Sequence, residues 1–95
     1  MSETIFVTAE LKMNADKPRQ QVVEAIEQFC LDMQSEEGCL QANATYDSKE
    51  PQRVILWERY ENRTAIEAHF AMPHTQAFIV AEVAELVQAF ETQAQ

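Results

Sequence analysis

The segment of residues 53–60, RVILWERY, constrains the fold more than any other stretch of this sequence. Its β-branched and aromatic residues predict a strand, and successive side chains of a strand point to opposite faces of a sheet. One face would carry Val54, Leu56, Glu58 and Tyr60, and the other Arg53, Ile55, Trp57 and Arg59. Both faces therefore hold large apolar side chains. If both faces are covered, we expect the protein to be a dimer.

Hydrophobic periodicity predicts two more strands and a helix in the first half of the chain. Residues 5–13 alternate between two sets of side chains, which is typical of a strand. Pro18 suits the first turn of a helix, where a backbone N–H is not needed. Apolar residues then recur at helical spacing, at Val22, Ile26, Phe29 and Met33. We expect Gly38, the only glycine, to end this helix before a second strand over residues 39–46.

The second half predicts a hairpin, two short helices and an ambiguous last segment. The turn residues DSKEP join the strands over 39–46 and 53–60. Asn62 can cap a short helix, and Pro73 restarts helical structure after a kink. The segment AEVAELVQAFETQ has helical propensity, yet residues 87–92 could form a strand. We predict one α+β domain over residues 1–95, with an antiparallel sheet that helices cover on one face.

Composition excludes several classes of partner. The 16 acidic residues outnumber the 7 basic ones and give a formal charge of −9. This charge argues against nucleic acid and against anionic membrane surfaces. No apolar run approaches the roughly 20 residues that span a bilayer, and no secretory signal is visible, so we expect a cytoplasmic protein. Cys30 and Cys39 form no CxxC motif and are expected to be buried thiols.

The two histidines, His69 and His74, lie five residues apart around Pro73 and are the only ones in the chain. A metal site usually needs a third ligand, which would have to be a carboxylate such as Glu58 or Glu67, and we therefore predict no metal. His69 is either a semi-buried histidine bonded to a carboxylate or a general base, since imidazole titrates near neutral pH. His74 falls in the first turn of a helix, where the helix dipole disfavours the protonated ring.

Glu58 is unusual because it lies between Leu56 and Tyr60 on a strand face that should be mostly apolar. A buried carboxylate needs a partner, or its pKa rises and the group stays protonated. His69 could be that partner, although the sequence alone does not choose one. The alternative is that this strand face is exposed to solvent and that Trp57 points into the core or an interface.

The motifs EEGCL, ILWERYENRTAIEAHF and MPHTQAF together resemble the antibiotic biosynthesis monooxygenase (ABM) family, over nearly the whole chain. Within it the chain is most similar to the small bacterial quinol monooxygenases. The resemblance implies a ferredoxin-like β-α-β-β-α-β fold, with a final strand near residues 87–92. It also implies a homodimer in which two sheets pack face to face, a dimeric α/β barrel.

The resemblance further implies that O₂ oxidises a quinol or a similar aromatic diol without flavin, haem or metal. A deprotonated diol supplies its own electrons, so an apolar pocket with a proton acceptor suffices. We expect His69 to be the base and Glu58 to orient it. The residues expected to bind the substrate are Tyr60, His74, Phe78, Leu56 and Trp57.

Departures from the family pattern narrow these expectations. Leu56 stands where polyketide-modifying members carry a substrate-binding Asn, which argues against a tricyclic antibiotic substrate. The first strand, FVTAELK, lacks the Asn of haem-degrading members, and Phe78 replaces their histidine. The alternatives are an isomerase of a small phosphorylated carbonyl compound, which Lys12, Lys17, Arg19 and Arg53 would have to serve, and a dimeric binding module without turnover.

Overall fold

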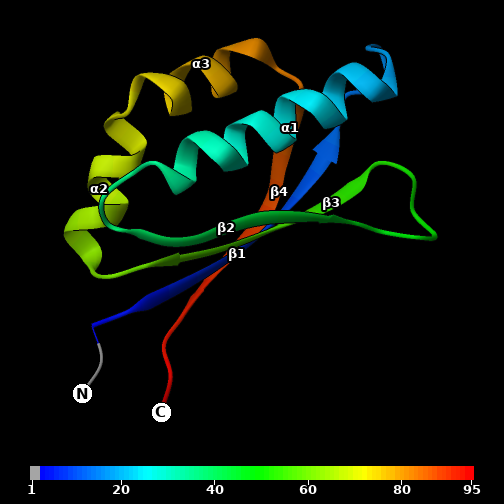
Figure 1. Cartoon of the computed structure of the whole chain (residues 1–95). Coiled ribbons are helices and arrows are strands. Elements are labelled where there is room, and N and C mark those ends of the chain that lie inside the picture. Colours follow the sequence, from blue (N-terminus) through cyan, green and yellow to red (C-terminus); the bar gives the residue numbers. More distant parts are fainter. Residues whose placement is uncertain (1–2) are drawn as a thin grey trace.

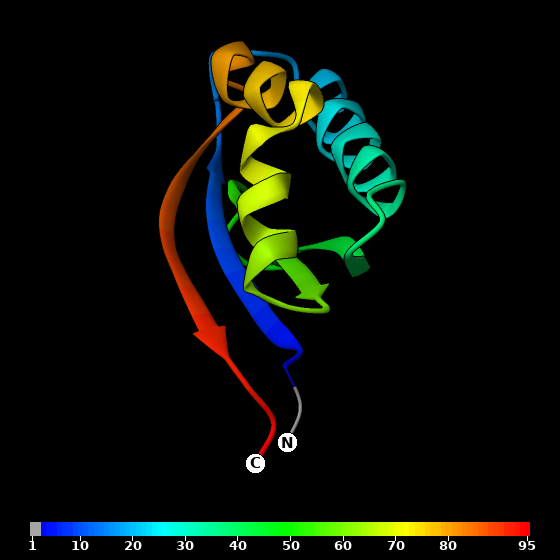
Figure 2. The same ribbon diagram turned by 90° about the vertical axis from the view of Figure 1, so that its left-hand side faces the viewer.

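The computed structural model describes residues 3–95 and consists of a four-stranded antiparallel sheet with helices on one side (Figures 1 and 2). The sheet has the order β2-β3-β1-β4, and every neighbouring pair of strands is antiparallel. This is the predicted ferredoxin-like arrangement, with the second helical region divided in two. The elements are β1 (Ile5–Met13), α1 (Arg19–Gln34), β2 (Cys39–Tyr46), β3 (Arg53–Tyr60), α2 (Arg63–Ala71), α3 (Pro73–Ala81) and β4 (Ala84–Thr92).

Prolines and a capping side chain determine where the helices begin. Helix α1 follows Pro18, and its predicted apolar stripe is buried against the sheet. The Asn62 side chain accepts a hydrogen bond from the Ala65 amide and so caps α2. Met72 is extended, as expected for a residue before proline, and Pro73 starts α3. The two short helices therefore meet at a kink instead of forming one rod.

Two boundaries differ from the sequence prediction. Helix α1 ends at Gln34 with Ser35 as its cap, so the expectation that Gly38 ends this helix is wrong. No described glycine has a positive φ, and the need for Gly38 is steric: a Cβ there would lie 2.4 Å from the Cβ of Ala65. The last segment does form the final strand, β4, which already begins at Ala84.

The two faces of the sheet have different environments. The helix-covered face contributes Ala9, Leu11, Val54 and Leu56 to the core. The other face is not covered by any helix (Figure 2), and on it the Trp57 side chain is 42% exposed and Phe90 is 54% exposed. None of the helices in the described part of the chain is both long and apolar enough to cross a membrane.

Candidate functional site

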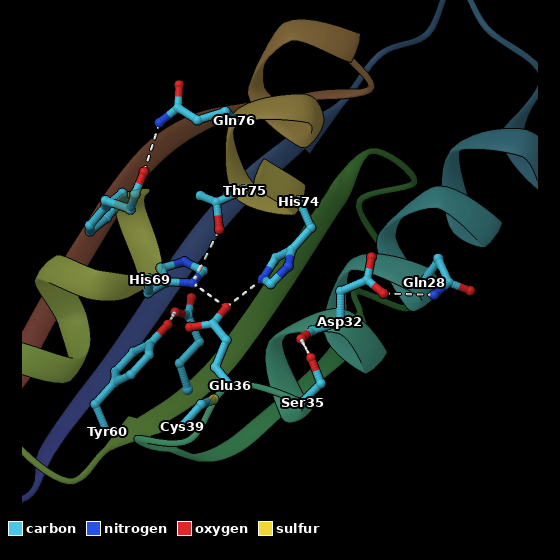
Figure 3. A network of polar contacts seen from close by, with 12 residues as sticks. Gln28, Asp32, Ser35, Glu36, Cys39, Tyr60, His69, His74, Thr75 and Gln76 are labelled. Atoms are coloured by element: carbon cyan, nitrogen blue, oxygen red, sulfur yellow. Dashed lines mark hydrogen bonds and ion pairs between the residues drawn. The ribbon is translucent and has the colours of Figure 1, made fainter. Parts of the chain in front are cut away.

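Two imidazole rings converge on one buried carboxylate under the helices (Figure 3). Glu36 Oε2 lies 2.9 Å from His69 Nδ1 and 2.6 Å from His74 Nε2. The side chains of Glu36 and His69 are 4% and 6% exposed, whereas that of His74 is 22% exposed. Thr75 Oγ1 lies 3.3 Å from the same nitrogen of His69. The histidines and Glu36 form what we call the Glu36 cluster.

The helix kink makes this convergence possible. On one continuous helix, residues five apart would point about 140° away from each other. Here His69 belongs to the last turn of α2 and His74 to the first turn of α3, with the extended Met72 between them. The change of direction at Pro73 turns both rings toward the connection between α1 and β2, which carries Glu36. The kink thus allows His69 and His74 to contact the same group although they are five residues apart.

The hydrogen-bond network defines which ring nitrogens carry protons when Glu36 is ionised. A carboxylate only accepts hydrogen bonds, so both contacting nitrogens must be donors. His69 is then protonated on Nδ1 and His74 on Nε2, an assignment that follows from the network. The remaining nitrogen of each neutral ring keeps its lone pair, which can accept a proton.

A second carboxyl group, the half-buried Glu58, lies close to the Glu36 cluster but has a different partner. The Tyr60 hydroxyl donates a hydrogen bond to Glu58 Oε1. Burial raises the pKa of Glu58, and the Tyr60 hydrogen bond and the nearby His69 only partly oppose this. Burial, reinforced by the charge of Glu58, also raises the pKa of Tyr60, so this phenol stays protonated. The sequence predicts Glu58 as the group that orients His69, whereas the carboxylate bonded to that ring is Glu36.

A shallow apolar groove of about 300 Å³ lies between α1 and α3 and reaches His74. Its size is at the lower end for small-molecule sites. The rings of Phe29 and Phe78 stack in it, with centroids 4.1 Å apart and planes 7° from parallel. A larger hollow of about 510 Å³, beside Asn14 and Glu82, contains neither histidine. The smaller groove is therefore the better candidate site, because a proton acceptor and aromatic walls meet there.

The structure brings together only some of the predicted site residues. His69 and His74 meet at Glu36, and Phe78 lines the groove as expected. Leu56 and Tyr60 are fully packed in the core beneath the helices and do not line the groove. Trp57 lies on the opposite face of the sheet, where its Nε1 donates to Thr45 Oγ1. Strand alternation points it away from Leu56, so Trp57 does not line this groove, and its predicted role in substrate binding stays a prediction.

Sequence reasoning missed Glu36, the residue that joins the two histidines. Glu36 belongs to the EEGCL motif, which contributes to the family resemblance but does not by itself indicate this role. The signal that could have found Glu36 is Gly38, two residues later, whose close contact with Ala65 holds this connection against α2. Contact between the two segments is also shown by the hydrogen bond from the Glu61 amide to the Gly38 carbonyl, 2.9 Å long.

The two cysteines are free thiols as predicted, but only Cys30 is buried, whereas Cys39 is half-buried. Burial raises the pKa of Cys30 to about 12 and that of Cys39 to about 11. A thiol with a raised pKa is a poor nucleophile at neutral pH, because the thiolate is the reactive form. The chemistry of this site therefore depends on imidazole and carboxyl groups.

Residues 4–81 of the chain match the model of the antibiotic biosynthesis monooxygenase family. This range includes all three residues of the Glu36 cluster. The protein belongs to this family, as its sequence motifs indicated. It is 30% identical over 70 residues to the uncharacterized protein YjcS of Bacillus subtilis. The matched region is 74% of this chain and 67% of that protein.

Solved structures share this fold. A structure of a protein named YjcS has a TM-score of 0.87 at 25% identity and covers 97% of this chain and 99% of that one. A Bacteroides thetaiotaomicron protein of unknown function, described as a possible oxidoreductase, has a TM-score of 0.81 at 22% identity, covering 97% and 100%. A structure named antibiotic biosynthesis monooxygenase has a TM-score of 0.83 at 19% identity, covering 96% and 98%.

Proposed function

We propose that this protein is a monooxygenase that oxidises a quinol or a related aromatic diol with O₂. The observation that carries the proposal is the Glu36 cluster at the end of an apolar groove with stacked aromatic walls. Membership of the antibiotic biosynthesis monooxygenase family supports the same class of reaction. Since one fold hosts several chemistries, the site and not the fold carries the argument.

In the proposed reaction, His74 accepts a proton from a substrate hydroxyl. Its ring lines the groove, whereas His69 is buried behind it, so His74 replaces His69 as the expected base. Glu36 stabilises the imidazolium that forms, and His69 holds Glu36 in position through Nδ1. The deprotonated diol donates electrons to O₂. One oxygen atom enters the ring and the other leaves as water, which converts the diol into a hydroxyquinone.

The lining of the groove disfavours the phosphorylated-carbonyl alternative. A phosphate group needs Lys or Arg side chains or a set of converging amides. None of the described residues that line this groove is Lys or Arg. Of the cations named for this role, Arg19 donates to the Pro51 carbonyl, and Arg53 pairs with Glu10 and Asp47. No observation in the groove therefore supports binding of a phosphate.

We also propose that two copies of the chain pack through the uncovered face of the sheet. Trp57 and Phe90 expose large apolar surfaces there. Arg59 lies over the Phe6 ring at 5.7 Å, and its buried Nε has no hydrogen-bond partner among the described residues. A second copy would cover the rings and could supply an acceptor for this nitrogen. Sedimentation tests this: a stable monomer of 10.9 kDa at micromolar concentration would refute the dimer.

Oxygen consumption tests the proposed reaction. The wild type is assayed with naphthoquinols and anthrone-like compounds beside His74→Gln, Glu36→Gln and the exposed neighbour Glu37→Gln. We expect His74→Gln to lower kcat by about 100-fold or more, since acid–base catalysis commonly contributes that much. Glu37→Gln should retain the wild-type rate. No oxygen uptake by the wild type across the panel would refute the proposal and favour a binding module without turnover.

A further inference from the structure

We propose that Glu36, His69 and His74 also form a binding site for one divalent transition-metal ion. One ligand atom from each residue lies within 4.8 Å of the other two. The sequence-based objection to a metal was the missing third ligand, and the structure supplies it from the α1–β2 connection. This inference depends on the geometry of the cluster alone and does not require the proposed oxidation.

Two of the three distances between ligand atoms suit an ion after small movements, and the third, between the two imidazole nitrogens, is within 4.8 Å and must shorten as an ion binds. Zinc and similar ions bind imidazole nitrogen and carboxylate oxygen at about 2.0–2.2 Å. Neighbouring ligand atoms are then roughly 3–3.4 Å apart, close to the 2.9 Å between Glu36 Oε2 and His69 Nδ1. The 2.6 Å contact to His74 Nε2 must lengthen by a few tenths of an ångström. His74 is at the partly exposed first turn of α3, where its side chain can move most easily.

The donor set selects the class of metal. Two imidazoles and one carboxylate suit zinc, cobalt, nickel or iron, whereas magnesium and calcium prefer oxygen ligands. Three protein ligands leave at least one coordination position for water or a small molecule. The partly exposed His74 provides access to that position from the groove. Thr75 Oγ1, 3.3 Å from the ligating nitrogen of His69, limits the space on the buried side.

Metal binding rearranges protons without releasing any from the cluster. The ion takes the positions of the hydrogens on His69 Nδ1 and His74 Nε2, and each ring proton moves to the other nitrogen. Both nitrogens of His74 are then occupied. The metal-loaded site therefore cannot accept a substrate proton at His74, so metal binding and the proposed base function exclude each other.

Calorimetric titration of the untagged, chelator-treated chain with ZnCl₂, and visible spectra with CoCl₂, test the site without any substrate. We expect one ion per chain and a cobalt spectrum of low-symmetry nitrogen and oxygen coordination. Glu36→Gln and His74→Gln should each weaken binding by more than about 100-fold, exceeding the cost of losing an outer hydrogen-bond partner of a ligand. Glu37→Gln, which removes the same charge one residue away, should bind as the wild type does.

Two results would overturn the metal site. The first is the absence of stoichiometric Zn²⁺ binding by the folded wild type. The second is an equal loss of affinity in Glu37→Gln and Glu36→Gln, which would show nonspecific attraction to a chain of charge −9. If the buried Glu36→Gln change prevents folding, the partly exposed His74→Gln variant decides: unchanged affinity there refutes the site. The titration tests only metal binding, and the oxygen-consumption assay tests only the oxidation. Either proposal can therefore fail without the other.

Discussion

Two carboxyl groups, Glu36 and Glu58, lie under the same helices but differ in position and in partners. Glu36 is on the connection after α1 and contacts two imidazoles, whereas Glu58 is on β3 and accepts a hydrogen bond from the Tyr60 hydroxyl. Burial raises the pKa of Glu58, since its nearest donor is a neutral phenol. Glu36 has two donors that can become cationic. Glu36 is therefore placed to stabilise a proton on either ring, whereas the partner of Glu58 is a phenol that stays protonated.

The largest expected effect is that of Glu36→Ala. This change leaves the buried His69 nitrogen and the partly exposed His74 nitrogen without their acceptor, and a buried donor left unsatisfied typically costs about 1–3 kcal/mol. We expect the free energy of unfolding to fall by roughly 3 kcal/mol, measured by urea denaturation. Glu37→Ala, at the exposed neighbouring position, is the matched control. Equal losses in the two variants would contradict the special position of Glu36.

An intermediate effect is expected for Gly38→Ala, which displaces Glu36 but not Glu58. The added Cβ would lie 2.4 Å from the Cβ of Ala65, so the connection must move away from α2. We expect a loss of about 1–3 kcal/mol, as for other overpacked sites, and weaker Zn²⁺ binding. The Ala65→Gly change in the same chain should restore much of both. No rescue by the second change would show that the close contact is not the cause.

The smallest effect is expected for Glu58→Gln. Because the folded-state pKa of Glu58 is raised, the folded chain holds this proton more tightly than the unfolded chain. The resulting stability is complete below the unfolded pKa and is lost as pH rises through the folded pKa. Glutamine does not titrate and can still accept from Tyr60, so the variant should be more stable than the wild type near neutral pH. Thermal unfolding over acidic to neutral pH checks this, and a gap that widens toward acid would contradict it.

The sequence predicted the elements of the fold well, because each has a strong local signal. The apolar stripe of α1, the alternation in β1 and β3, and the cap and proline of α2 and α3 lie within short windows. The last strand was ambiguous because its residues also have helical propensity. Pairing with β1, a long-range contact, determines its structure.

The site was less predictable, since its residues meet only through tertiary structure. His69 and His74 were found from local sequence, but Glu36 lies more than 30 residues earlier and reaches them through the packing of Gly38 against α2. Trp57, next to Leu56 and Glu58 in the sequence, lies on the other face of the sheet because side chains alternate along a strand. Separation in the sequence is therefore a poor guide to which side chains share a site. Distant residues can meet, and neighbours on a strand point to opposite faces.

The most direct test of the Glu36 cluster is a long-range ¹H–¹⁵N correlation spectrum of the imidazole rings in the metal-free chain. It reports which nitrogen of each histidine carries the proton. We predict that His69 is protonated on Nδ1 and His74 on Nε2, and that Glu36→Gln alters both patterns while Glu37→Gln alters neither. A proton on Nε2 of His69, or histidine signals unchanged by Glu36→Gln, would contradict the account.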